Sequence, residues 1–73
     1  MKIKFQKYQG TGNDFIIIDN KSLDFPTQNS SLINRLCNRK FGIGSDGLII
    51  INPSENTDFE MLYFNSDGKL GSM

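Results

Sequence analysis

The 73-residue sequence lacks histidine and tryptophan and contains a single cysteine, Cys37. One cysteine cannot form an internal disulfide, and without histidine no zinc cluster of the cysteine/histidine type can form. A lone thiol is more typical of a reducing compartment than of an oxidising one. A domain this short therefore has neither of these cross-links and depends on its hydrophobic core or on partners.

Net charge and long apolar runs are also missing. Eight basic and eight acidic residues cancel, and the basic residues are spread along the chain, so no basic patch indicates a nucleic-acid partner. The apolar runs FIII and LIII are far too short to cross a bilayer, and the N-terminal MKIKFQKYQG lacks the apolar core of a signal peptide. We therefore expect a cytoplasmic protein without nucleic-acid or membrane partners.

Four segments have the pattern of β-strands. Apolar and polar residues alternate from residue 3 to residue 8, which predicts a half-buried strand with Ile3 on its apolar face. Residues 14–19 and 47–51 are rich in isoleucine without alternation, which is typical of strands covered on both faces. Residues 58–65 predict a fourth strand, and the sequence NSDG at its end is a hairpin-type turn signal.

Between the second and third of these strands, the sequence favours a helix. Apolar residues recur there at helical spacing: Leu32, Ile33, Leu36 and Cys37. Pro26 and Asn29 are typical of a helix start, and Gly42 of a helix end. We expect a helix of about three turns with one apolar face, in which Cys37 is a core residue rather than a catalytic thiol.

The sequence GTGNDF, residues 10–15, is the first of three candidate functional stretches. It begins like a dinucleotide-binding loop, but Phe15 stands where the third glycine would be, and a strand follows instead of a helix. Its plainer interpretation is an irregular turn in which Gly10 and Gly12 adopt positive φ. Alternatively, the glycines bring the backbone close to a small ligand that is bound by the Asn13 amide.

Two later stretches repeat this theme. The sequence FGIGSDGLIII, residues 41–51, is explained mostly by a helix end and a turn before a buried strand. The sequence YFNSDG places Asn65 at the end of a strand, where side chains are often presented to a site, although turn propensity explains it nearly as well. No one of the three stretches decides the function alone.

As an ordered set, FQKYQGTGNDFIIID, LCNRKFGIGSDGLIII and MLYFNSDG closely resemble the N-terminal part of the diaminopimelate epimerase family. The resemblance implies a cofactor-independent epimerase that converts LL-diaminopimelate to the meso form in lysine and peptidoglycan precursor synthesis. It also implies an α/β (α+β) fold of two domains, each a mostly antiparallel sheet curled around a central helix. Residues 1–73 would be a partial N-terminal domain, without its central helix and without the second domain.

The resemblance also implies site residues. Asn13 and Asn65 match asparagines that bind the substrate, whereas the family's two catalytic cysteines have no counterpart here. The first of these cysteines opens a Cys-Gly-Asn-Gly motif shortly after the position of NSDG, and this sequence contains no such motif. We therefore expect no catalytic residue, metal or cofactor in this chain, no turnover by the chain alone, and an exposed apolar surface that could form a homo-oligomer.

Two other hypotheses stay open at this point. The chain could be a noncatalytic module that binds a small ligand or serves in assembly, in which case it should behave as a stable monomer with a sharp thermal transition. It could also be part of a related thiol-dependent isomerase of the proline racemase type, although the ordered motifs argue against that.

Overall fold

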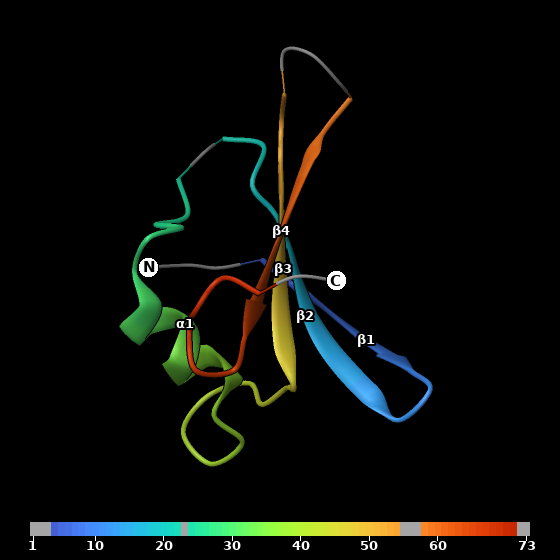
Figure 1. Cartoon of the computed structure of the whole chain (residues 1–73), viewed down its shortest axis with the longest axis vertical. Coiled ribbons are helices and arrows are strands. Elements are labelled where there is room, and N and C mark those ends of the chain that lie inside the picture. Colours follow the sequence, from blue (N-terminus) through green and yellow to red (C-terminus); the bar gives the residue numbers. More distant parts are fainter. Residues whose placement is uncertain (1–3, 23, 55–57, 72–73) are drawn as a thin grey trace.

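A computed structural model describes residues 4–22, 24–54 and 58–71. In order along the chain, the elements are β1 (Gln6–Gly10), β2 (Asn13–Asp19), α1 (Ser30–Cys37), β3 (Gly47–Asn52) and β4 (Glu60–Asn65). The strands form one sheet in the order β1-β2-β3-β4 (Figure 1). Because β2 and β3 are parallel and the other two pairs are antiparallel, the predicted α+β class and mostly antiparallel sheet are confirmed.

The hydrophobic core lies between α1 and one face of the sheet (Figure 1). It combines alternate residues of the strands with the apolar side of the helix: Ile16, Ile18, Phe25, Ile33, Cys37, Leu48, Ile50 and Phe64. Each fully buried isoleucine or leucine contributes roughly 1.5–3 kcal/mol relative to an exposed one. The thiol-bearing residue is only 3% exposed, so its predicted place in the core is confirmed.

The opposite face of the sheet, called here the open face, is not covered by any helix among the described residues. On β2, Phe15 and Ile17 are only half-buried there, and Met61 of β4 is 47% exposed. Ile49 is buried because it lies on the central strand β3 between β2 and β4. The prediction that 14–19 is covered on both faces is therefore wrong for the open face.

The first strand differs from the prediction in position and burial. It runs from residue 6 to residue 10 instead of 3 to 8, and Ile3 lies outside the described residues. Its first four residues are all exposed, so it is not half-buried. The physical reason is its place at the edge of the sheet, where it pairs with β2 alone.

The helix is present but shorter than predicted. It begins after Asn29, whose side chain accepts a hydrogen bond from the Leu32 backbone N–H at 3.0 Å. It ends at Cys37 after eight residues, because Asn38 has an extended backbone and breaks the helical path. Gly42 therefore does not end the helix. None of the described residues forms a helix long and apolar enough to cross a membrane.

The junction between β1 and β2 is a regular two-residue turn. Gly10 pairs with Asn13, so Thr11 and Gly12 alone connect the strands. Gly12 has a φ of 82°, as predicted, but Gly10 does not have a positive φ because it still belongs to the extended strand. The expectation of an irregular turn with two positive-φ glycines is wrong.

The turn predicted from NSDG is confirmed. The Gly68 N–H donates to the Asn65 carbonyl at 2.9 Å, and Gly68 has a φ of 88°. The chain then returns beside β4, because the Asn65 N–H donates to the Lys69 carbonyl at 2.9 Å and the Gly71 N–H to the Tyr63 carbonyl at 2.8 Å. This return places Gly71 next to β4 on the sheet edge.

Candidate functional site

Asn13 and Asn65, the two residues predicted to bind the substrate, lie on the same face of the sheet. The strand register pairs Phe15 with Gly47 and Gly47 with Asn65, so these three residues face the same way. Asn13 is two residues before Phe15 in β2 and shares its face. This is the open face, and both asparagines are exposed on it.

The spacing of the two asparagines follows from the sheet. Asn13 lies on β2 and Asn65 on β4, with β3 between them. Because neighbouring strands are about 4.8 Å apart and each residue rises about 3.3 Å, the two backbones are separated by roughly 10 Å across the sheet and by about two residues, roughly 7 Å, along it. Amides at this separation suit a small ligand with polar groups at both of its ends.

A cluster of charged side chains occupies the other face of the sheet beside these residues. At its centre is Asp14, which is only 7% exposed. Arg39 donates to both of its carboxylate oxygens, at 2.8 and 3.1 Å, and the Lys7 ammonium group lies 3.0 Å from one of them. Lys7 also donates to the Gly44 carbonyl. The buried carboxylate is therefore fully paired, as a charge in this position requires.

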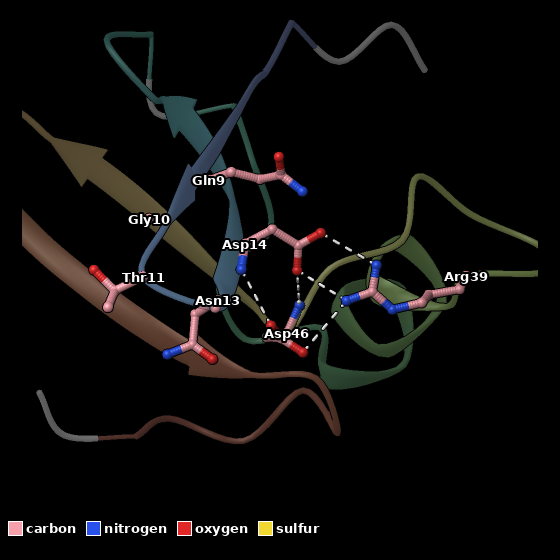
Figure 2. Close-up of a pocket in the computed structure, with 8 residues that line it drawn as sticks. Gln9, Gly10, Thr11, Asn13, Asp14, Arg39 and Asp46 are labelled. Atoms are coloured by element: carbon pink, nitrogen blue, oxygen red, sulfur yellow. Dashed lines mark hydrogen bonds and ion pairs between the residues drawn. The ribbon is translucent and has the colours of Figure 1, made fainter.

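Asp46 joins the cluster from the segment before β3. The Asp14 N–H donates to the Asp46 carboxylate at 3.1 Å, and the Asp46 N–H donates to the Asp14 carboxylate at 3.0 Å. Arg39 also reaches Asp46 at 3.3 Å. Figure 2 shows these contacts, and in it the Asn13 amide points away from Asp14 and Arg39. The cluster thus fixes the start of β2 while leaving the neighbouring amide free.

The electrostatics of the cluster suit anchoring rather than proton transfer. The hydrogen bonds from Arg39 and then Lys7 hold the pKa of the Asp14 carboxyl far below its ordinary value, and Asp14 in turn raises the pKa of Arg39. A carboxylate with so low a pKa is a very weak base at neutral pH. We therefore assign Asp14 to holding the backbone in place.

A depression of about 470 Å³ lies over this cluster and the β1–β2 turn. It is lined by residues from both: Gln9, Gly10, Thr11, Gly12, Asn13, Asp14, Arg39 and Asp46. Asn65 is not among them, so the depression does not unite the two predicted binding residues. The open face, where both asparagines lie, is the surface that unites them.

The described residues offer neither a metal centre nor a reactive thiol. They contain no group of three or more side chains of the types that hold a metal ion. Cys37 is buried in the core, and this burial raises the pKa of its thiol, which disfavours the thiolate form that would accept a proton.

Sequence reasoning missed the charged cluster and Tyr63. Arg39 lies near the predicted helix end, just before the stretch 41–51, and Asp46 lies within that stretch, which local patterns explain as a helix end and a turn. Their contacts with Asp14 join residues 25 and 32 positions apart, so no local pattern indicates them. Tyr63 lies on the open face opposite Ile49, and its ring reaches Gly47, between the two asparagines.

Comparison with known proteins shows which family the chain is similar to. A family model described as diaminopimelate epimerase matches residues 5–73. A diaminopimelate epimerase of Flavobacterium psychrophilum is 58% identical over 71 residues, which are 97% of this chain and 28% of that protein. Those of Rippkaea orientalis and Nostoc punctiforme are 52% and 54% identical over 69 residues, 93% of this chain and 25% of each relative.

The chain thus spans about a quarter of the length of these relatives. The match covers all three motifs that the sequence analysis singled out, and it includes both Asn13 and Asn65. On this match, the chain belongs to the diaminopimelate epimerase family.

Proposed function

We propose that this chain provides part of the substrate-binding surface of an epimerase that interconverts LL- and meso-diaminopimelate. The observation that carries the proposal is the common placement of Asn13 and Asn65 at one end of the open face. Side-chain amides donate and accept hydrogen bonds without titrating, so they suit a substrate that carries both ammonium and carboxylate groups.

The chain's share of the chemistry is binding and orientation. Inverting an α-carbon requires one group to remove a proton and another to return a proton on the opposite side. The only thiol of the 73 residues is the buried Cys37. The two proton-transferring groups therefore come from polypeptide beyond these residues, and by the family resemblance they are thiols that work without pyridoxal phosphate.

The open face supports the proposal that residues 1–73 are a partial N-terminal domain. Apolar side chains lie along it, from the half-buried Ile17 and Ile51 to the exposed Met61. An apolar surface of this kind is typical of a surface that packs against more protein. We propose that polypeptide corresponding to the rest of the longer relatives packs against this face. A homo-oligomer would be the alternative way to bury it. The complete enzyme would act in the cytoplasm, in lysine and peptidoglycan precursor synthesis.

A chimera tests the proposal. In it, this chain replaces the segment that it matches in the Flavobacterium psychrophilum relative. The chimera and the isolated chain are each incubated with LL-diaminopimelate in deuterium oxide, and deuterium at the α-carbon is followed by mass spectrometry. We expect exchange by the chimera at a rate near that of the relative, and no exchange above background by the isolated chain.

Two results would contradict the proposal. A chimera that folds but does not exchange the α-proton would show that this chain cannot serve as part of the enzyme. Exchange by the isolated chain would show that it holds proton-transferring groups of its own. An isolated chain that is a stable monomer with a sharp thermal transition, together with an inactive chimera, would favour a noncatalytic module instead.

A further inference from the structure

Tyr63 lies on the open face in the middle of β4. It pairs with Ile49 in the strand register, one row further along the sheet than Gly47 and Asn65. Its ring meets the ring of Phe15 edge to face, with centroids 5.8 Å apart and an angle of 68° between the planes. The side chain therefore leans from its own row over Gly47 towards β2.

Two glycines leave room for the ring in this position. A Cβ atom at Gly47 would lie 2.9 Å from the Tyr63 hydroxyl and 3.0 Å from Cε1, and a Cβ atom at Gly71 would lie 2.9 Å from Cδ2. Contacts below 3.0 Å force a neighbour to move. The phenol thus occupies the space that side chains at positions 47 and 71 would take.

This arrangement brings the hydroxyl into the row of Asn65. Gly47 is the register partner of Asn65, so a hydroxyl beside Gly47 lies at the same level along the sheet. The Asn65 amide nitrogen is itself 3.0 Å from the Cβ position of Gly71, which also contacts the Tyr63 ring. The hydroxyl therefore lies at the Gly47 edge of the ring and the Asn65 amide near the Gly71 edge, at the same level along the sheet, with Asn13 on β2 beyond Gly47.

The hydroxyl has no function in the fold. The ring alone makes the contacts with Phe15 and Gly71, and a phenylalanine would make the same ones. The described residues provide no hydrogen-bond partner for the half-buried hydroxyl. A phenol O–H donates a strong hydrogen bond to a carboxylate.

We propose that the Tyr63 hydroxyl is a third binding group of the surface formed by Asn13 and Asn65, and that it donates a hydrogen bond to a carboxylate oxygen of the substrate. The inference rests on the proposed function, because it names a further contact to the same diaminopimelate. The ligand is a small amino acid with an ammonium and a carboxylate group at each end, and one of its carboxylates accepts hydrogen bonds from neutral donors.

The test is Tyr63→Phe in the chimera, with Ser31→Ala as the control, because the other tyrosine, Tyr8, pairs with Phe15 and shares the open face. Ser31 is exposed on α1, which packs against the opposite face of the sheet, so its hydroxyl is remote from this surface. We expect Tyr63→Phe to raise KM about tenfold, the size of one lost hydrogen bond to a charged group, with kcat within about twofold. The melting temperature should not change, because the ring stays. Ser31→Ala should leave both constants unchanged.

A second ligand separates the contact of the hydroxyl from other effects of the substitution. LL-Diaminopimelate with both carboxylates converted to carboxamides should bind the parental chimera more weakly than diaminopimelate does. In Tyr63→Phe, this loss of affinity should be about tenfold smaller, because the hydroxyl that distinguishes the two ligands is absent.

The outcomes separate the inference from the proposed function. An active parental chimera whose KM is unaffected by Tyr63→Phe overturns the inference alone. Equal carboxamide penalties with and without the hydroxyl also overturn it. A folded but inactive parental chimera overturns the proposed function and the inference together.

Discussion

Asp14 and Asp46 are joined by two reciprocal hydrogen bonds between backbone and side chain and by one between their backbones, from the Asp46 N–H to the Asp14 carbonyl at 3.1 Å. The N–H of each residue donates to the carboxylate of the other, at 3.1 Å from Asp14 and at 3.0 Å from Asp46. The pair connects the start of β2 to the segment before β3, and Arg39 bridges the two carboxylates. These contacts hold together the first residues of the parallel pairing of β2 with β3. The contacts among Asp14, Arg39 and Asp46 are called here the polar lock.

The lock predicts that Asp14→Asn destabilises the chain. The substitution removes the buried charge that pairs with Arg39 and Lys7, so Lys7 loses its carboxylate partner and Arg39 retains only Asp46. We expect a lower urea midpoint for Asp14→Asn. Asp19→Asn is the matched control on the same strand, because Asp19 is exposed and its contact with Lys21 is long, at 3.7 Å. Equal midpoints for the two variants would contradict a stabilising lock.

The lowered pKa of the Asp14 carboxyl predicts how the stability of the fold depends on pH. Its pKa in the folded chain lies far below the ordinary value of 3.8, so the unfolded chain takes up its proton first as the pH falls. The contribution of Asp14 to the free energy of unfolding is complete above about pH 4 to 5, and it is lost progressively as the pH falls below that range. Urea titrations at pH 6 and pH 3 should show this loss in the parent and a smaller one in Asp14→Asn. A pH dependence that is the same in both would contradict it.

Cys37 should react slowly in the folded chain. It is buried in the core, and burial raises the pKa of its thiol above the ordinary value of 9.0, so little thiolate is present and reagents cannot reach it. We expect labelling by a thiol reagent at pH 8 to be at least tenfold slower in buffer than in urea. Equal rates would show that the thiol is accessible.

Cys37→Ser tests the same residue by stability. The substitution replaces the thiol, which contacts the Ser45 side chain, with a more polar hydroxyl in the core, and with Ser45 as a hydrogen-bond partner it should cost about 1 kcal/mol of unfolding free energy. Ser31→Ala, at an exposed position of the same helix, is the control and should have a small effect. A neutral Cys37→Ser would contradict the assignment of Cys37 to the core.

Gly42 and Gly12 should respond differently to alanine. A Cβ atom at Gly42 would lie 2.0 Å from the Arg35 carbonyl oxygen and 2.8 Å from that of Leu36, so the backbone after the helix would have to move. We expect Gly42→Ala to cost about 3 kcal/mol or more. At Gly12 nothing lies within 4 Å, and only the φ of 82° opposes a side chain, at roughly 1–2 kcal/mol. Urea unfolding of both variants measures the difference, and a reversed order would contradict the geometry.

Local patterns were sufficient for much of the fold. The isoleucine-rich stretches at 14–19 and 47–51 became β2 and β3, and the NSDG turn follows β4. The helix was predicted because its apolar residues face one side. Its length was not, because the extended backbone of Asn38 depends on the loop that follows. The exposure of β1 was missed because edge positions are set by strand order, which alternation does not reveal.

The site could be predicted only in part. The motifs indicated Asn13 and Asn65, but the parallel register that puts them on one face is a property of the folded sheet. The role of Arg39 depends on a partner 25 residues away. The position of the Tyr63 phenol depends on two glycines, one on β3 and one beyond the turn after β4.

The central claim is that the Asn13 and Asn65 amides hold diaminopimelate, and kcat/KM of the chimera tests it most directly. Gln28→Ala, which removes an exposed amide from a loop, is the control. We expect Asn13→Ala and Asn65→Ala each to lower kcat/KM at least about tenfold while the melting temperature is retained. Values for both variants equal to that of Gln28→Ala would contradict the claim.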